Sequence, residues 1–139
     1  MLILLFISFL SFFNSPVVAD PVEVKITITN LKSANGAVYV AIFKPNNDFP
    51  EGDPHSGIKM VPSNGISVTL KTKLPAGEYA FAVFQDLNKN EKIDQNFVGI
   101  PTEPYGFSKN FKPKFSAPKF EDCKVVVNSN SNSFDIKLL

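Results

Sequence analysis

Apolar residues alternate with polar ones in several short stretches, and this period of two constrains the fold more than any other feature. In residues 22–29, charged residues and threonines separate Val22, Val24, Ile26 and Ile28. Successive side chains of a β-strand point to opposite faces, so the pattern predicts a strand with one buried face. No segment has apolar residues at helical spacing over the length of a helix. The sequence therefore predicts an all-β fold.

Turn-forming residues separate the other expected strands. These strands cover residues 37–43, 58–61, 66–70, 79–84, 123–127 and 134–138. The intervening turns, including an Asn-Gly pair, predict three hairpins. They would join 22–29 with 37–43, 58–61 with 66–70, and 123–127 with 134–138. About seven short strands are typical of a single antiparallel Greek-key β-sandwich.

The start of the chain predicts a signal peptide. Residues 1–13 are predominantly apolar and precede a small-residue cleavage pattern, so we expect cleavage after Ala19. The alternative, a membrane anchor, requires roughly 20 apolar residues. We therefore expect an exported protein, periplasmic or secreted, with no stable membrane span after signal removal. Residues 20–139 would form one β-sandwich domain.

Charge and cysteine content exclude several classes of protein. The chain has 14 basic and 13 acidic residues and a net charge of +1, which argues against nucleic acid or an anionic membrane surface as a partner. The single cysteine, Cys123, cannot form an internal disulfide, and we expect it to be buried and inert in strand 123–127. The only histidine, His55, lies in a long loop over residues 44–57, where we expect it to be solvated.

Oxygen-bearing side chains follow the strand at 79–84 with a regular spacing. Asp86, Asn88, Asn90 and Asp94 occupy relative positions 1, 3, 5 and 9, and Lys92 at position 7 can offer its backbone carbonyl. Calcium takes six to eight oxygen ligands, and a tightly curled loop can point alternate oxygens at one ion. The spacing therefore predicts a calcium-binding loop.

This loop departs from the usual calcium pattern at two positions. Glu91 stands at position 6, where the sharp turn favours glycine, and Phe97 stands at position 12, where a bidentate glutamate would lie. Water or a distant carboxylate, from Glu103, Glu121 or Asp122, would have to complete the coordination. The alternative is a metal-free connection in which Asn and Asp side chains bond to their own backbone.

Residues 95–120 form a long segment rich in proline and aromatic residues. Four prolines and two glycines between residues 99 and 118 exclude a helix or a long central strand. Burial would stabilise each phenylalanine by about 1.5–3 kcal/mol, so the segment folds onto the sandwich or is completed by a partner. In the first case the rings anchor an ordered loop. In the second they line a binding groove for an unidentified envelope or extracellular ligand, with Glu103, Tyr105 and Phe107 as candidate ligand-binding residues.

The sequence names no catalytic residue. It has no nucleophile elbow, phosphate loop, dinucleotide fingerprint or zinc-ligand spacing. The alternative to a non-enzymatic binding module is a small periplasmic hydrolase or other enzyme that pairs Glu103 with Asp122 or Glu121. A purely structural envelope module is a third hypothesis.

Four motifs carry a resemblance to a known family. They are Leu74-Pro-Ala-Gly-Glu-Tyr-Ala, the Asp86–Asp94 loop, Gly99-Ile-Pro-Thr-Glu-Pro-Tyr-Gly-Phe-Ser108 and Ala117-Pro-Lys-Phe-Glu-Asp122. In this order they resemble the bacterial secreted family named domain of unknown function 2141. The resemblance implies a transthyretin-like or immunoglobulin-like sandwich and no assigned reaction. The family commonly has His before the loop and Gly at its sixth position, where this chain has Gln85 and Glu91.

Overall fold

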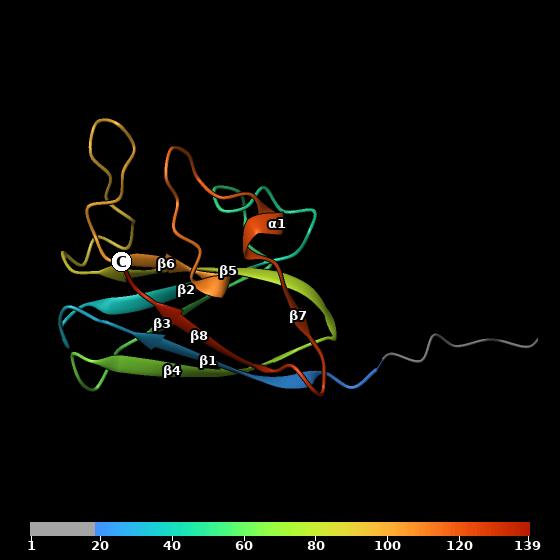
Figure 1. The fold of residues 1–139 in the computed structure, drawn as a ribbon. Coiled ribbons are helices and arrows are strands. Elements are labelled where there is room, and N and C mark those ends of the chain that lie inside the picture. Colours follow the sequence, from blue (N-terminus) through green and yellow to red (C-terminus); the bar gives the residue numbers. More distant parts are fainter. Residues whose placement is uncertain (1–18) are drawn as a thin grey trace, which may run out of the picture.

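A computed structural model describes residues 19–139 of the protein, so the predicted signal peptide, apart from Ala19, lies outside the described residues. Eight strands and two short helical turns make up the fold (Figure 1). In chain order they are β1 (Val22–Thr29), β2 (Ala37–Phe43), β3 (Ser56–Met60), β4 (Ser67–Leu74), β5 (Gly77–Asp86), β6 (Tyr105–Phe107), η1 (Ser108–Asn110), α1 (Phe120–Cys123), β7 (Val125–Val127) and β8 (Ser133–Lys137). No helix within residues 19–139 has the length and apolar character to cross a membrane.

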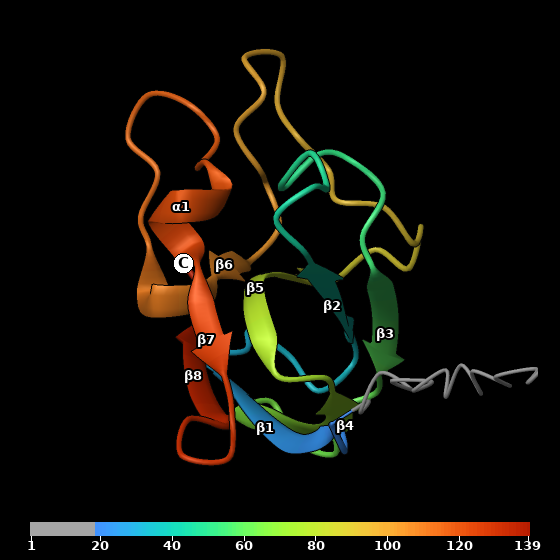
Figure 2. The same ribbon diagram turned by 90° about the vertical axis from the view of Figure 1, so that its right-hand side faces the viewer.

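The strands form two sheets that face each other (Figures 1 and 2). The smaller sheet has three strands in the order β4-β1-β8. The larger sheet has five, in the order β3-β2-β5-β6, and β7 pairs with the first residues of β5. Neighbouring strands are antiparallel except for β1 and β8, which are parallel. The predicted all-β sandwich is therefore confirmed, with one parallel pair that the sequence did not indicate.

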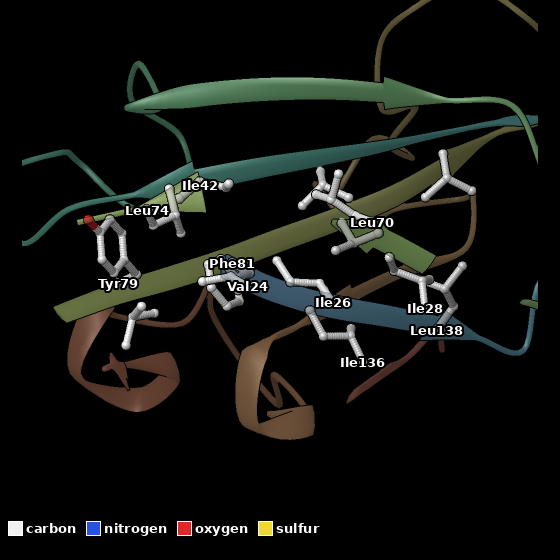
Figure 3. Close-up of a cluster of buried hydrophobic side chains, with 14 of the residues drawn as sticks. Val24, Ile26, Ile28, Ile42, Leu70, Leu74, Tyr79, Phe81, Ile136 and Leu138 are labelled. Atoms are coloured by element: carbon white, nitrogen blue, oxygen red, sulfur yellow. The ribbon is translucent and has the colours of Figure 1, made fainter. Parts of the chain in front are cut away.

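The main core lies between the two sheets (Figure 3). From β1, the alternating residues Val24, Ile26 and Ile28 are completely buried. Alternate residues of β2 and β5, including Ile42 and Phe81, meet them from the larger sheet. Burial of each such side chain stabilises the fold by about 1.5–3 kcal/mol. The period of two in residues 22–29 thus arises, as predicted, from one face turned to a core.

All three predicted hairpins are wrong. The first two fail for the same reason, because the strands of each predicted pair lie in different sheets. β1 and β2 lie in different sheets, as do β3 and β4. The connections over residues 30–36 and 61–66 cross from sheet to sheet and lie side by side, with the Leu31 N–H donating to the Ile66 carbonyl at 3.3 Å. The Asn64 carboxamide oxygen accepts the N–H groups of Ile66 and Ser67. The Asn-Gly turn therefore starts β4 instead of closing a hairpin.

The third predicted hairpin fails at the end of the chain. Cys123 ends the short helix α1 instead of starting a strand. β7 pairs with β5, and β8 pairs with β1 in the opposite sheet. A tight turn between Asn128 and Ser131 carries the chain across, because each strand satisfies its backbone groups on a different sheet.

A second, smaller cluster covers the outer face of the larger sheet. In it, Phe49, Phe107, Phe111 and Phe120 pack with Ala80 and Cys123, and we call this set the outer aromatic cluster; Ala82 and Tyr105 pack against it. The ring of Phe49 lies at its centre, 5.8 Å from the ring of Phe107 and 6.3 Å from that of Phe120. These residues come from three separate segments. The rings of residues 105–120 thus anchor a long ordered loop, with the exception of Phe115.

Candidate functional site

The predicted calcium loop continues directly from β5 at one end of the larger sheet. Asp86 is the last residue of the strand and is buried. Its carboxylate accepts the N–H groups of Asn90 and Glu91 at 3.2 and 2.9 Å. Glu91 has φ of 63°, in the left-handed region that favours glycine. The loop therefore makes a sharp curl at its sixth position without the glycine that usually permits it.

Three polar side chains of the loop converge on one point. The carboxylate of Asp94 accepts hydrogen bonds from the side-chain amides of Asn88 and Asn90. The Asn88 oxygen also accepts the Asn90 N–H at 3.2 Å, and the Asn90 oxygen accepts the Lys92 N–H at 3.0 Å. These local bonds are those of the metal-free alternative. A half-turn of each amide would exchange nitrogen for oxygen at nearly unchanged shape, so the same side chains can also face a cation.

Glu103 closes the base of the loop. Its carboxylate is buried and accepts the N–H groups of Leu87 at 2.8 Å and Asp94 at 3.2 Å. Thr102 also donates its N–H to the Asp94 carbonyl at 2.8 Å. Glu103 therefore joins the two ends of the curl. Of the three carboxylates predicted to complete the coordination, it is the one that contacts the loop.

The two other candidate carboxylates bond elsewhere, on α1. Glu121 lies 2.8 Å from the Lys124 ammonium, and Asp122 accepts the Lys119 N–H at 2.9 Å. Neither shares a hydrogen-bond partner with Glu103. The carboxylate pairs of the enzyme alternative thus have no contact in common, and that alternative remains a prediction.

The donor set of the loop suits one kind of ion. Among residues 19–139, no three side chains of Asp, Glu, His or Cys are grouped so as to hold a metal. Asp86 and Asp94 supply carboxylates, while Asn88 and Asn90 supply amides. Zinc prefers nitrogen and sulfur ligands, whereas calcium accepts amide and carbonyl oxygens. The loop is therefore compatible with calcium.

Tyr105 and Phe107 are neighbours on the same face of β6, with ring centroids 5.9 Å apart, but they differ in burial. The Phe107 ring is buried in the outer aromatic cluster. Tyr105 is half-buried and pairs across the sheet with Phe84, which pairs with Tyr39. The Tyr39 and Phe84 rings stack with centroids 4.9 Å apart and planes 8° apart. We call Tyr39, Phe84 and Tyr105 the aromatic row; the sequence alone could not find it, because it depends on the register of three strands.

A lysine connects the aromatic row to the loop. Lys59 on β3 places its ammonium 5.4 Å from the centroid of the Tyr39 ring and 2.6 Å from the Glu91 carboxylate. The hydrogen bond raises the pKa of Lys59 above its usual value and lowers that of Glu91. Both side chains are exposed, so solvent screens the pair. The pair marks the point where the loop lies beside β3.

Three further residues that the sequence singled out differ in burial: Gln85 and Cys123 are buried, whereas His55 is exposed. The buried Gln85 amide donates to the Ser33 carbonyl at 2.6 Å, and its oxygen accepts the Lys32 N–H at 2.8 Å, so it fastens the 30–36 connection. Cys123 is fully buried, and burial raises the pKa of its thiol to about 12. His55 is exposed in the 44–55 connection. The Gln85 side chain, although adjacent in sequence to Asp86, bonds only to residues of the 30–36 connection.

Comparison with known proteins gives one match. A family model described as an uncharacterized protein conserved in bacteria matches residues 26–135. No curated protein and no solved structure matches the chain. The match runs from β1 to β8 and includes the 86–94 loop, Glu103 and the outer aromatic cluster. The transthyretin-like or immunoglobulin-like relationship stays a prediction.

Proposed function

The chain belongs to the bacterial family DUF2141, and from this premise we propose that it is an exported, non-enzymatic binding module of the envelope with calcium as a structural ion in its 86–94 loop. Asp86, Asn88, Asn90 and Asp94 would hold the ion through their side chains, and Lys92 through its backbone carbonyl. Bound calcium supplies a fixed positive charge that draws these oxygens together.

The convergence of Asn88, Asn90 and Asp94 beyond the buried Asp86 is the observation that carries this proposal. The curl at Glu91, whose φ of 63° costs a non-glycine residue on the order of 1–2 kcal/mol, brings these side chains together. The curl lets Asp86 accept two N–H groups while Asn88, Asn90 and Asp94 turn toward one another. These contacts bring the side chains close together, and a half-turn of the two amides would point their oxygens at an ion.

Occupation of the loop would affect the neighbouring binding surface. The loop is tied to β3 by the Lys59–Glu91 pair, and Lys59 lies over the aromatic row. Glu103 is already engaged with backbone N–H groups and Phe107 is buried, so Tyr105 is the predicted ligand-binding residue with an accessible ring. We infer that the ligand contacts the aromatic row, and that calcium fixes the loop at its border.

Thermal unfolding with added calcium tests the metal site. With only two carboxylates the affinity should be modest, on the order of 0.1–1 mM. Calcium at about 100 times the dissociation constant would stabilise the protein by about 2.7 kcal/mol, which raises the Tm by several degrees. Asp94→Asn should abolish the rise because it removes one of the two charges, whereas Asp53→Asn, in the exposed 44–55 connection, should leave it intact.

Two controls separate calcium from general salt effects. Magnesium at the same concentration should produce a smaller rise, since it requires a tighter octahedral cage. Sodium chloride of matched ionic strength should produce none. Calcium at 10 mM is roughly ten times the largest dissociation constant expected for this site. An unchanged Tm of the unsubstituted protein at that concentration would refute the metal site.

A further inference from the structure

Two loop tips carry fully exposed phenylalanines. Phe97 and Phe115 have no measurable burial, and Val98 and Ile100 beside Phe97 are 61 % and 55 % exposed. In both views of the ribbon, the gold tip near residue 97 and the orange tip near residue 115 rise on the same side of the larger sheet (Figures 1 and 2). Both extend farther than the 44–55 connection. Exposed phenylalanines at projecting tips are unfavourable in water and indicate a surface that covers them.

The first tip is held rigidly. The side-chain oxygen of Asn96 accepts the N–H groups of Val98 and Ile100, each at 3.0 Å. The Asn96 N–H donates to the Ile100 carbonyl at 2.9 Å, and Gln95 pairs with Pro101. The apolar residues are thus presented on a closed hairpin that loses little freedom on binding.

The second tip combines its phenylalanine with positive charge. Residues 104–120 contain four lysines, Lys109, Lys112, Lys114 and Lys119, and no acidic residue. Within the part of the chain that the structure describes, none of the four forms an ion pair. A shallow hollow of about 300 Å³ lies beside Phe115, lined by Lys112, Lys114 and Lys119 and by one acidic residue, Asp122. Three ammonium groups against one carboxylate leave this surface with a positive charge that attracts phosphate groups.

From these observations we propose that the protein docks on an anionic lipid bilayer, with Phe97 and Phe115 inserted at the interface and the lysines on lipid phosphates. A bilayer fits the shape of the surface, because a fluid phase admits two isolated tips without a complementary partner surface. It also fits the charge, since lysines near an anionic surface each strengthen binding.

The charge of the projecting tips differs from the net charge of the whole chain, on which the expectation about membrane binding was based. The net charge of +1 argued against a membrane surface. Lys112, Lys114 and Lys119 belong to the second projecting segment, residues 111–119, whereas Lys109 lies in η1 beside the strands (Figures 1 and 2). Asp48, Glu51 and Asp53 belong to the 44–55 connection, which is set back from the tips. The positive charge can therefore face the bilayer while these acidic residues remain in water.

Sedimentation with vesicles tests the proposal. The purified protein should bind vesicles of phosphatidylcholine with phosphatidylglycerol, and bind at least tenfold more weakly to pure phosphatidylcholine. Phe97→Ala with Phe115→Ala should lower binding at least tenfold, and by about a hundredfold if both rings are fully inserted. Lys112→Glu with Lys114→Glu should lower it further and remove most of its salt dependence.

Matched variants elsewhere on the surface serve as controls. Val61 and Ile66 are 79 % and 74 % exposed, and their replacement by alanine should leave vesicle binding unchanged. Lys71→Glu with Lys73→Glu makes the same charge change on exposed positions of β4 and should reduce binding less than the 112/114 pair. Any contribution of residues 1–19 is common to all variants. Unchanged melting temperatures would show that every variant is folded.

Three results would overturn the proposal. The first is no binding of the unsubstituted protein to anionic vesicles at low salt. The second is binding that the two tip substitutions leave unaltered. The third is equal loss of binding in the tip variants and the control variants. Millimolar inorganic phosphate should compete only weakly, and complete release by phosphate would instead indicate a soluble anion as the ligand. None of these outcomes depends on calcium in the 86–94 loop.

Discussion

The main core and the outer aromatic cluster lie on opposite faces of the same sheet but are built differently. The main core is mostly aliphatic and comes from alternate residues of regular strands. The outer aromatic cluster joins Phe49 to rings more than fifty residues away, in segments without regular pattern. The first therefore depends on strand periodicity and the second on the tertiary position of loops. The comparison teaches that one face of the sheet holds the fold together while the other positions the loops that carry the candidate sites.

The largest expected effect is on the main core. Phe81→Ala removes a completely buried ring, and we expect it to lower the free energy of unfolding by about 3–5 kcal/mol. Phe84→Ala is the matched control, because Phe84 lies on the same strand but is half-buried on the outer face. Urea denaturation measures both. Equal losses would contradict the distinction between the two faces.

A hydroxyl group links the two regions. The buried Ser108 side chain accepts the Phe81 N–H at 2.9 Å and donates to the Cys123 carbonyl at 2.6 Å. Ser108→Ala leaves both backbone groups without a partner and should cost about 1–3 kcal/mol. Ser129→Ala, at an exposed position, should change stability by less than about 0.5 kcal/mol. A loss no larger than that of the control would mean that water replaces the hydroxyl.

Removal of the central ring of the outer aromatic cluster should have a smaller and more local effect. Phe49→Ala should cost about 1–2 kcal/mol, because Phe49 is only partly buried. Hydrogen exchange should accelerate in residues 44–55 and 108–120 while β1 and β2 keep their protection. Faster exchange in all strands alike would show that the cluster is part of one cooperative core.

The 86–94 loop should tolerate a change that the cores would not. Glu91→Gly relieves the left-handed strain and should raise the Tm by about 3 °C. Glu91→Ala is the control, because it also loses the contact with Lys59 but keeps a side chain at this φ. The glycine variant should therefore melt above the alanine variant. The reverse order would remove the argument from backbone strain.

The smallest expected effect concerns the buried thiol. Burial raises the pKa of Cys123 to about 12, so at pH 8 the folded protein should react with thiol reagents only as fast as it unfolds. As the pH rises above 9, the unfolded thiol loses its proton before the folded one does. Stability should therefore fall between pH 9 and 12, and more steeply than in Cys123→Ala. Rapid labelling under native conditions would contradict this burial.

What the sequence could predict follows from which interactions are local. Alternation in residues 22–29 identified both the strand and its buried face, because these depend only on neighbours in the chain. The Asn64–Gly65 turn looked like a hairpin because a turn signal does not specify whether the next strand joins the same sheet. Polar spacing located the 86–94 loop. The aromatic row and the hydrogen bonds of Glu103 to the two ends of the loop depend on how distant segments pair. The spacing of residues along the sequence does not specify that pairing.

The parallel pairing of β1 with β8 places a condition on biosynthesis. The edge of β1 that faces away from β4 finds its hydrogen-bond partners in residues 132–138, more than a hundred positions later. The smaller sheet therefore cannot be completed until residues 133–137 have left the ribosome. Before that point the polypeptide has no finished sandwich and can still pass through a narrow translocation channel, as the proposed export requires.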